Sequence, residues 1–434
     1  MARKYKDSGI EWIGQIPKEW KICRIKNVAA LFGRIGFRGY TSDDLNKDGD
    51  GAITLSPSNM IPMGMDFSKV TYLSWKKYEE SPEIMIRNGD LLMVKTGSSY
   101  GKVSYVDNLP KEATINPQIL RVVPSINHKY LGYYMQTDLF IYQVEGGIVG
   151  GTIPTISQEK INNFHVVLPP LSDQQRIADY LDKVCGKADE MIALQEKMIE
   201  ELKAYKQSII TEAVTKGLNP NVPMKDSGID WIGEIPEHWD KDKIIRIFNL
   251  IGSGTTPSSS DNELYEGNLN WIQSGDINGG DLYESKNKIS EKTLKKYSAL
   301  TMYDAPFIII AMYGASVGNI SISHINGCVN QACCVMSETK QDFKYVFYAI
   351  KSAKDYLIYK AVGGGQPNIS QSTLKQLWLP VPSLFEQQQI ASFLDSKCSE
   401  IDSLIAIKQQ KITELKEYKK SVIYEYVTGK KEVV

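Results

Sequence analysis

The sequence predicts an α+β protein with an internal pseudo-two-fold repeat, in which two mixed α/β domains are separated by an antiparallel coiled coil of two long helices. A short phrase, DSGIEWIGQIPKEW at 7–20, returns as DSGIDWIGEIPEHW at 226–239. A glycine-rich segment, GGTIPTISQ at 150–158, is similar to GGGQPNISQ at 363–371. Each glycine-rich segment is followed by a long stretch with apolar residues at heptad spacing. The chain therefore consists of two copies of one unit.

The repeated phrase, at 7–20 and 226–239, opens each copy. Each copy of the phrase contains two tryptophans, one proline and two glycines. This composition is typical of a turn-rich segment that anchors its rings on another element. We expect the repeated phrase to pack close to the ends of the long helices.

The middle of each copy, at 29–149 and 248–362, differs between the copies except at isolated points such as KTGSSYGKVS against MYGASVGNIS. Apolar runs such as DLLMV and APFIIIAM predict strands. The pieces HKYLGYYMQTDLFIYQV and FKYVFYAIKSAKDYLIYKAV predict helices at equivalent places. Each middle is therefore predicted to form a mixed α/β domain.

Two stretches of about forty residues are predicted to be helices about 60 Å long. In the first, the seam residues are Ile177, Leu181, Val184, Ala188, Met191, Gln195, Met198, Leu202, Tyr205 and Ile209. In the second, they are Ile390, Leu394, Cys398, Ile401, Ile405, Lys408, Ile412, Leu415 and Val422. Steps of four and three predict a coiled coil. Because a whole domain lies between the two helices, antiparallel pairing is favoured.

The two long helices contain polar residues within their apolar seams and charged residues along their length. Gln195 and Lys408 interrupt the two seams at equivalent positions, where they either set the register as a polar layer or are simply solvated. The segment 173–216 carries seven basic and nine acidic residues, and 386–425 carries six and seven. Both helices are slightly acidic, which indicates spacers rather than DNA-binding helices.

The whole chain has 50 Lys and Arg residues against 51 Asp and Glu, which excludes a polybasic binder and leaves nucleic-acid contact to local placement. The sequence shows no apolar stretch of a signal peptide, and no run approaches the roughly 18 apolar residues of a membrane helix. The six cysteines lack C-x-x-C spacing. We therefore expect a cytoplasmic protein with free thiols and no membrane contact.

We predict no catalytic residue and no metal site. The fragment INPQ at 115–118 lacks the second proline and the aromatic of an amino-methyltransferase motif. The segment GSGTTPSSS at 252–260 matches neither G-x-G-x-x-G nor a Walker sequence. The four histidines lie far apart, without partners at ligand spacing. The chain is therefore predicted not to be an enzyme by itself.

Polar, glycine-punctuated loops remain, and they are rich in hydrogen-bond donors. They are FGRIGFRGYTSDD (32–44), KTGSSYGK (95–102), SGTTPSSSDN (253–262), WIQSGDING (271–279) and MYGASVGN (312–319). Arg reads guanine, Asn and Gln read adenine, and Ser, Thr and backbone N–H groups hold phosphates. These loops are either a DNA-reading surface or plain surface loops.

The paired phrase, the paired GG loops followed by ISQ, the paired LPPL...QQRIADYLD and VPSL...QQQIASFLD blocks and the two long helices carry a family resemblance. In these features the chain resembles the specificity (S) subunit of type I restriction-modification enzymes, over essentially its whole length. The resemblance implies that 29–149 and 248–362 are target recognition domains, each reading one half of a bipartite DNA site. It also implies that the long helices are spacers between them.

The same resemblance implies partners and cofactors. The partners are double-stranded DNA, two methyltransferase subunits that flip the adenine, and restriction subunits. S-adenosylmethionine, ATP and Mg²⁺ are expected in those subunits, and none in this chain. The expected division is a first recognition domain with its opening phrase at 1–170, a spacer helix at 171–218, a second recognition domain at 219–383 and a second spacer helix at 384–434.

The residues predicted to contact DNA come from the donor-rich loops. In the first domain they are Arg34, Arg38, Lys95, Ser98, Ser99, Tyr100 and Lys102, and in the second Gln273, Ser274, Tyr313 and Ser316. Because the loops of the two domains share almost no side chains, the DNA site is expected to be asymmetric.

Two other functions fit the same sequence. One is an orphan, swappable specificity cassette without a complex of its own. The other is a coiled-coil scaffold with two protein-binding modules. DNA binding in the presence of the methyltransferase separates the scaffold from a DNA reader.

Overall fold

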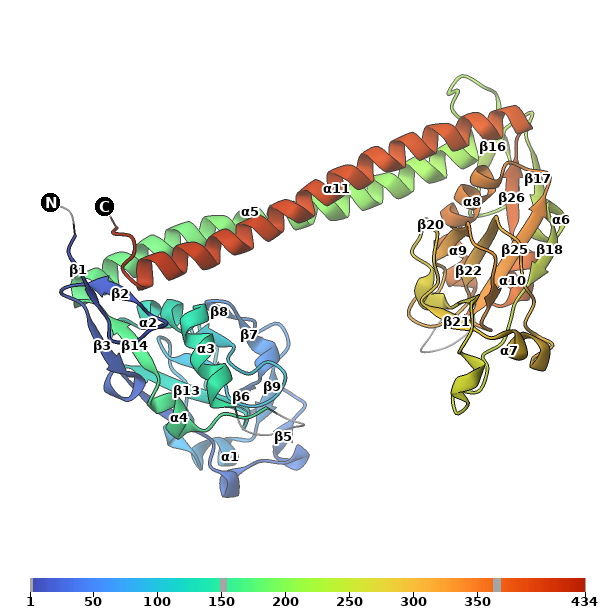
Figure 1. Ribbon diagram of the computed structural model, residues 1–434. Helices are drawn as coiled ribbons and strands as arrows, with labels where there is room; N and C mark the ends of the chain where they lie inside the picture. The colour runs from blue at the N-terminus through green and yellow to red at the C-terminus, as the bar shows by residue number, and fades with distance from the viewer. Residues whose placement is uncertain (1–2, 149–153, 362–367, 434) are drawn as a thin grey trace. The chain divides into compact units, whose positions relative to one another are not determined.

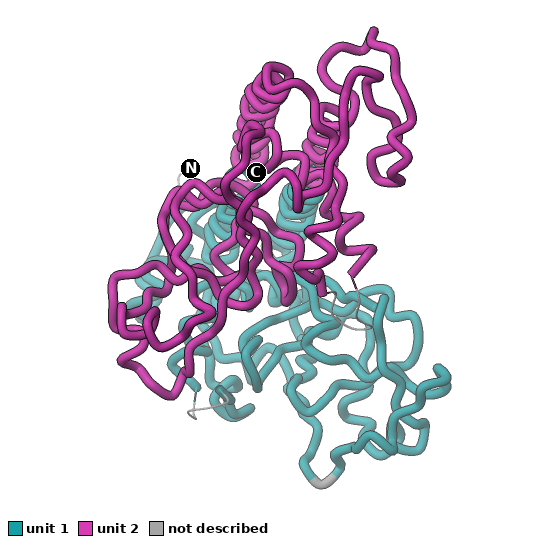
Figure 2. Tube along the Cα trace, turned by 90° about the vertical axis from the view of Figure 1, so that its right-hand side faces the viewer, with its two compact units in different colours: residues 1–196, 410–434 teal, residues 197–409 magenta. Residues whose placement is uncertain are grey.

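The structure is a computed structural model that describes residues 3–148, 154–361 and 368–433. Two compact units make up the chain: residues 1–196 with 410–434 form unit 1, and residues 197–409 form unit 2 (Figure 2). The long helices α5 (Leu171–Lys216) and α11 (Leu384–Val427) each give one part to each unit. The division of the chain at 170, 218 and 383 stays a prediction.

Unit 1 contains two four-stranded sheets, ordered β11-β10-β13-β4 and β12-β6-β9-β5 (Figure 1). Every neighbouring pair in the first sheet is antiparallel, whereas β12 runs parallel to β6 in the second. The strands of the first sheet are β4 (Ala29–Gly33), β10 (Leu91–Val94), β11 (Val103–Tyr105) and β13 (Ile119–Pro124). Those of the second are β5 (Leu45–Asn46), β6 (Ala52–Leu55), β9 (Thr71–Leu73) and β12 (Ala113–Ile115).

Strand β10 is apolar at every position because both of its faces are buried. Leu91 and Met93 lie in the core that also contains residues of helices α2 (His128–Tyr134) and α3 (Asp138–Gly147). Leu92 and Val94 lie in a second core, shared with strands β6 and β12. The first sheet is therefore a layer between helices on one face and the second sheet on the other.

Shorter elements complete unit 1. Strands β1 (Tyr5–Asp7) and β2 (Gln15–Pro17) form a hairpin, β3 (Lys21–Arg24) pairs with β14 (His165–Leu168), and β7 (Met60–Ile61) pairs with β8 (Gly64–Met65). The remaining helices are α1 (Trp75–Glu79) and α4 (Gln158–Asn162).

Unit 2 repeats this plan with a five-stranded sheet, β18-β25-β22-β23-β20, and a three-stranded sheet, β21-β19-β24. The first contains β18 (Phe248–Gly252), β20 (Asp281–Leu282), β22 (Phe307–Ala311), β23 (Ile320–Ser323) and β25 (Cys333–Thr339). The second contains β19 (Leu269–Ile272), β21 (Asn287–Ile289) and β24 (Cys328–Val329). Strand β22 again has two buried faces: Ile308 and Ile310 belong to one core, and Phe307 and Ile309 to another.

The short helices of unit 2 are α6 (Ile244–Ile247), α7 (Glu291–Lys296), α8 (Phe343–Ser352), α9 (Lys354–Lys360) and α10 (Gln371–Lys375). Four of them, α7 to α10, follow the order of α1 to α4 in unit 1, and α6 takes the place of the 3-10 turn Ile25–Asn27. Strands β15 (Met224–Asp226) and β16 (Glu234–Pro236) form a hairpin, and β17 (Asp240–Lys243) pairs with β26 (Trp378–Val381).

Helices α5 and α11 pair antiparallel within each unit. In unit 1 the rings of Tyr180 and Tyr426 are 4.4 Å apart, and further along α5 Asp189 pairs with Lys419. In unit 2 Lys408 Nζ lies 3.5 Å from Met198 Sδ, and Lys206 pairs with Asp402. In both units, residue numbers fall along α11 as they rise along α5. The predicted fold class, with two mixed domains and an antiparallel helix pair, is confirmed.

The predicted seam of α11 is confirmed, but that of α5 is wrong at Met191 and Tyr205. Met191 and Tyr205 are 43% and 59% exposed, whereas Ile192 and Ile199 are buried. Adjacent apolar residues at 191 and 192 offer two stripes about 100° apart on a helix that advances 3.6 residues per turn. Packing against α11 decides which of the two stripes is buried, and this cannot be predicted from the sequence of α5 alone. The polar layer of Gln195 and Lys408 stays a prediction.

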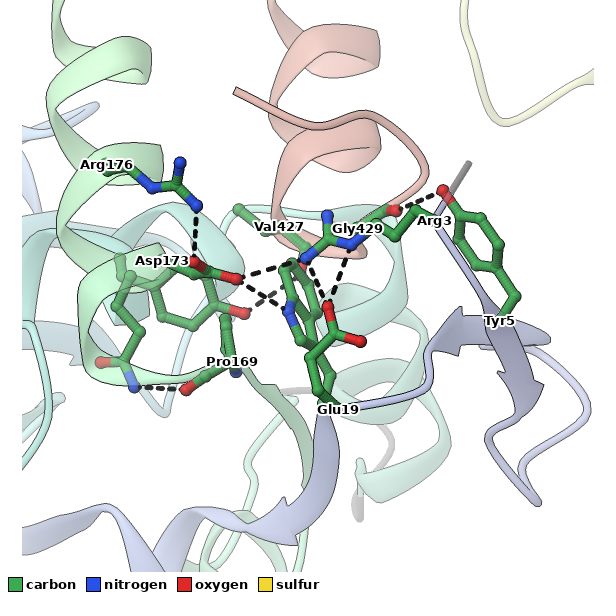
Figure 3. Close-up of polar contacts among 11 residues, drawn as sticks. Arg3, Tyr5, Glu19, Pro169, Asp173, Arg176, Val427 and Gly429 are labelled. Carbon is green, nitrogen blue, oxygen red and sulfur yellow. Dashed lines mark hydrogen bonds and ion pairs between the residues drawn. The ribbon is translucent and has the colours of Figure 1, made fainter. Parts of the chain in front are cut away.

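The repeated phrase anchors its second tryptophan at the ends of the long helices, as predicted. Trp20 is buried and donates from Nε1 to Oδ2 of Asp173, 3.2 Å away at the start of α5. In Figure 3, Arg3 reaches the same carboxylate, and Tyr5 donates to the backbone carbonyl of Gly429 beyond the end of α11. Trp239 repeats the arrangement in unit 2, where its Nε1 donates to Glu386 at the start of α11.

A buried tyrosine ties each domain to the helices. The hydroxyl of Tyr130 donates to the carbonyl oxygens of Val167 and Val427, at 2.7 and 3.0 Å. In unit 2 the hydroxyl of Tyr345 lies 3.1 Å from the carbonyl of Pro380 and 3.3 Å from that of Val214. Burial raises the pKa of both tyrosines well above the usual range. Both phenols are therefore neutral donors that fix each domain on its part of the helix pair.

Across the described ranges, no helix combines the length and apolar character that spanning a membrane requires.

Candidate nucleic-acid interface

Four segments of unit 1 meet at one edge of its sheets. Strands β4 and β10 are both antiparallel to β13, so the ends of β4 and β10 lie beside the start of β13. Gln118, just before β13, accepts from the amide of Lys95, just after β10. The amide of Asn116 donates to the carbonyl of Leu55, at the end of β6 in the second sheet. The loops that leave β4, β6 and β10 and the turn that enters β13 therefore form one surface.

Unit 2 brings the corresponding four segments together. Strands β18 and β22 are both antiparallel to β25, and their ends lie beside its start. The amide of Met312, after β22, donates to the carbonyl of Ala332, just before β25. The amide of Asn330 donates to the carbonyl of Ile272, at the end of β19. We call these two surfaces the loop edges of unit 1 and unit 2.

The hairpin loops at the centre of the two loop edges have the same backbone. Gly97 and Gly101 adopt φ values of +103° and +78°, and Gly314 and Gly318 adopt +85° and +74°. Such left-handed backbone strains any residue with a Cβ, so these positions need glycine. The amide of Gly101 donates to the carbonyl of Val94 at 2.9 Å, and Gly318 bonds Ala311 likewise at 2.8 Å. The match between KTGSSYGK and MYGASVGN is therefore a match of structure.

Five of the residues predicted to contact DNA lie on the unit 1 hairpin. Ser98 and Ser99 are exposed at its tip, and Tyr100 packs partly against the core. Lys102 donates to the carbonyl of Pro57, 3.3 Å away, in the loop that leaves β6. Lys95 is half-buried and lies over Gly33, and burial lowers its pKa. The hairpin therefore presents two hydroxyls at its tip and two cations at its base.

The two predicted arginines occupy different environments. Arg34 is 6% exposed and donates to the carbonyl of Ile115 and the hydroxyl of Thr114, at 3.2 and 3.0 Å. Its guanidinium therefore serves the packing of the domain, and its position does not support the prediction of DNA contact. Arg38 lies in the 3-10 turn Gly36–Arg38 with 37% of its side chain exposed, 3.5 Å from the carboxylate of Glu83. Its contact with DNA stays a prediction.

The predicted residues of unit 2 also lie on its loop edge. Gln273 follows β19 and accepts from the side-chain amide of Asn287 at 3.0 Å, and Ser274 begins the next turn. Ser316 lies on the hairpin after β22 and is partly exposed. Tyr313, at the base of that hairpin, is partly buried, which raises its pKa.

Two pairs of matched turns were missed by the sequence analysis. The side chain of Asn116 accepts from the amide of Gln118 at 3.0 Å, and Asn330 accepts from the amide of Ala332 at 3.1 Å. These Asx turns place Gln118 and Gln331 on the surface of the loop edges. Comparing INPQ with VNQA, 214 residues later, would have shown that the fragment belongs to the repeat.

The second pair of turns follows β6 and β19. The amide of Ser56 donates to the side chain of Asn59 at 3.0 Å, and that of Gln273 donates to Asp276 at 2.9 Å. Ser58 is exposed in the first of these turns. The two turn sequences, SPSN and QSGD, have almost no residues in common. Their correspondence is therefore visible only in the hydrogen bonds of the turns.

The cysteines are poor candidates for reactive groups. Burial raises the pKa of Cys185 and Cys328 to about 11 and that of Cys333 and Cys334 to about 12. Such thiols remain protonated near neutral pH and are weak nucleophiles. In the part of the chain that the structure describes, no group of three or more His, Cys, Asp or Glu side chains is placed to hold a metal ion.

Comparisons with known proteins point to one family. The family model for the type I restriction modification DNA specificity domain matches twice, over residues 17–204 and 236–417. A provisionally named type I restriction enzyme specificity subunit, MjaX of Methanocaldococcus jannaschii, is 27% identical, with 96% of this chain and 95% of the relative covered. The EcoKI specificity subunit of Escherichia coli strain K12 is 20% identical, with 90% and 84% covered.

Two solved structures share the fold. A chain from a study of complex assembly and conformational transition of the type I R-M system superimposes with a TM-score of 0.71 at 16% identity, covering 95% of this chain and 99% of its own. The HsdS subunit from Thermoanaerobacter tengcongensis superimposes with a TM-score of 0.50 at 16% identity, covering 95% and 98%.

Proposed function

The chain belongs to the family of type I restriction modification DNA specificity proteins, and from this premise we propose that units 1 and 2 each read one half of an asymmetric, bipartite DNA site. It is a specificity subunit with two tandem recognition domains. Specificity subunits are the DNA-recognition components of their systems.

The observation that supports the proposal most is the pair of matched loop edges. Each brings four loops to one end of a rigid sheet, and these loops carry hydroxyl, amide and backbone N–H groups. Such groups bind phosphates and read base edges in a groove. We place Ser58, Gln118 and Gln331 among the contacting residues, together with the predicted set other than Arg34.

The two loop edges share a backbone but differ in side chains, which favours different half-sites. On the hairpins, Lys95, Ser98, Tyr100 and Lys102 of unit 1 correspond to Met312, Ala315, Val317 and Asn319 of unit 2. The unit 1 hairpin offers two cations to phosphates where the unit 2 hairpin offers none at these positions. We therefore expect the unit 1 hairpin to add more to the salt dependence of DNA binding than the unit 2 hairpin does.

Selection from a random duplex library tests the proposal. The full chain, bound to the methyltransferase subunit of its own system, is mixed with the library, and the retained DNA is sequenced. We expect two different short motifs at a fixed gap. Retention of DNA without any motif, or no retention at all, would contradict DNA reading and favour a protein scaffold.

We also propose where the methyltransferase subunits bind. Among the exposed apolar residues of each unit's helix pair, three lie along its middle: Met191, Leu194 and Tyr418 in unit 1, and Leu404, Ile407 and Tyr205 in unit 2. We call these the outer rod residues. Each member has its counterpart 213 residues away, so the exposure itself is repeated. Exposed apolar residues scattered singly are ordinary, but a repeated set indicates a protein-binding surface.

Two equivalent surfaces fit two methyltransferase subunits, one on each unit. Leu194 is 55% and Ile407 61% exposed, so a charge at either position is tolerated by the fold. Leu194→Glu and Ile407→Glu are each expected to lose one of the two copies, counted by native mass spectrometry, and the double variant to lose both. Two retained copies in the double variant would contradict this docking site.

In this proposal the methyltransferase subunits hold S-adenosylmethionine, and restriction subunits that join through them hold ATP and Mg²⁺. Location in the cytoplasm stays a prediction.

A further inference from the structure

Unit 2 has an apolar cleft of about 790 Å³ beside the end of α5. Its walls include Tyr205, Ile209 and Ala213 of α5, Leu218 and Met224 of the segment that follows, and Phe393 of α11. Tyr205, Leu218 and Phe393 are exposed, although they are large apolar side chains. The cleft therefore leaves a substantial apolar surface in contact with water.

The corresponding place in unit 1 is filled by the chain itself. SIITEAVT at 208–215 aligns with SVIYEYVT at 421–428, so Tyr426 stands where unit 2 has Ala213. Tyr180 stands where unit 2 has Phe393, and its ring lies 4.4 Å from that of Tyr426. Both rings pack against the core of unit 1. An aromatic ring therefore fits this place in the repeated scaffold.

The rim of the unit 2 cleft indicates what kind of molecule brings the missing ring. Glu212, Glu234, Lys216 and Lys397 also line the cleft, and the first three are exposed, so these charged side chains form its rim. A rim with both signs of charge suits a protein surface and disfavours the polyanionic DNA backbone. Tyr205 lines the cleft and is also one of the outer rod residues, so the cleft continues the surface assigned to the methyltransferase.

We propose that the unit 2 cleft receives an aromatic side chain of the methyltransferase subunit that docks on unit 2, in the place that Tyr426 fills in unit 1. This inference rests on the proposed docking of the methyltransferase on the outer rod residues. It goes beyond that docking because it predicts different methyltransferase affinities at the two sites. A buried aromatic anchor dominates the affinity of many protein interfaces, so the copy on unit 2 is held more tightly than the copy on unit 1.

The substitution Ala213→Tyr tests the proposal, because it gives unit 2 the ring that unit 1 already has. The matched control is Ala204→Tyr, which adds the same side chain at an exposed position of α5. The full chain of each variant is titrated with the methyltransferase of its own system and examined by native mass spectrometry. We expect Ala213→Tyr to weaken binding of the unit 2 copy by about tenfold or more, and Ala204→Tyr to leave both affinities unchanged.

Hydrogen exchange identifies which copy is lost. We expect Ala213→Tyr to lose methyltransferase-dependent protection around Phe393–Ile407 and to keep it around Tyr180–Leu194. If Ala213→Tyr fails to fold, Phe393→Glu places a charge on the exposed wall of the cleft and is expected to have the same effect.

The outcomes separate this inference from the proposed function. Wild-type binding of both copies to a folded Ala213→Tyr chain, or to Phe393→Glu where it replaces that variant, overturns the cleft assignment while the docking surface stands. Loss of the unit 1 copy instead also overturns it. A wild-type chain that binds no methyltransferase contradicts the proposed function itself.

Discussion

Trp239 donates from its indole nitrogen to Oε1 of Glu386, 3.1 Å away, and this bond joins the repeated phrase of unit 2 to the start of α11. Unit 1 makes the same bond with a different acid, from Trp20 to Asp173 at 3.2 Å. The tryptophan also closes over the end of the other helix: a Cβ on Gly217 would lie 3.1 Å from the ring of Trp239. The phrase occurs twice because each unit must join the start of one long helix to the end of the other.

The Glu386 carboxylate is expected to make unit 2 sensitive to acid. Burial alone would raise its pKa, but hydrogen bonds from His238, Ser383 and Trp239 outweigh burial and lower the pKa to about 2, from an ordinary value of 4.5. A carboxyl whose pKa is lowered by folding stabilises the protein above its unfolded pKa. That contribution is lost as the pH falls from about 4.5 through about 2.

Urea titrations over this pH range measure the effect. Glu386→Gln is expected to lower the free energy of unfolding near neutral pH and to flatten its fall between pH 4.5 and 2. Glu414→Gln, at an exposed position of the same helix, serves as the control and should follow the wild-type curve. A Glu386→Gln curve parallel to wild type would show that the hydrogen-bonded carboxylate has no such role.

The apolar seam, rather than the ion pairs beside it, is expected to hold α5 and α11 together. Lys206 lies 2.6 Å from Asp402, but 59% of the Asp402 side chain is exposed, and exposed pairs contribute less than about 1 kcal/mol. Ile401, which is 5% exposed, is expected to cost about 3 kcal/mol when replaced by alanine. Calorimetric unfolding of Asp402→Asn and Ile401→Ala compares the two, and equal losses would refute the ranking.

The two arginines that follow β4 are expected to differ in what their loss affects. Arg38→Ala should weaken DNA binding by about 1–3 kcal/mol and relax sequence preference at one base pair, if its guanidinium reads a base. Arg34→Ala should instead destabilise unit 1 by about 1–3 kcal/mol, because Thr114 and the carbonyl of Ile115 lose a buried donor. Unfolding and DNA selection on both variants check this; an unchanged selection profile for Arg38→Ala would exclude it from the interface.

The duplicated architecture could be predicted from the sequence because both copies retain long segments of similar sequence. The phrase at 7–20, the helix starts at Leu171 and Leu384, and the hairpin glycines are visible as repeated letters. The α5 seam was harder, since Met191 and Ile192 are both apolar and only the partner helix decides which one is buried.

The loop edge could be predicted only in part, for two physical reasons. Burial of Arg34 depends on strand β12, which lies about 80 residues away in the chain and is brought close by the second sheet. The turns at Ser56–Asn59 and Gln273–Asp276 have the same hydrogen bonds but almost no letters in common. Side chains on the loop edges vary between the copies, whereas the backbone of the matched turns does not.

Methylation mapping of a hairpin transplant tests whether each unit reads its own half of one DNA site. The transplant gives unit 1 the hairpin of unit 2 through Lys95→Met, Thr96→Tyr, Ser98→Ala, Tyr100→Val and Lys102→Asn, and methylated adenines are mapped in cells that carry either chain with the methyltransferase. We predict an asymmetric, bipartite motif for the wild type and a change in only one half of it for the transplant. A palindromic wild-type motif, or a transplant that alters both halves or neither, would show that the two units do not each read their own half of the site.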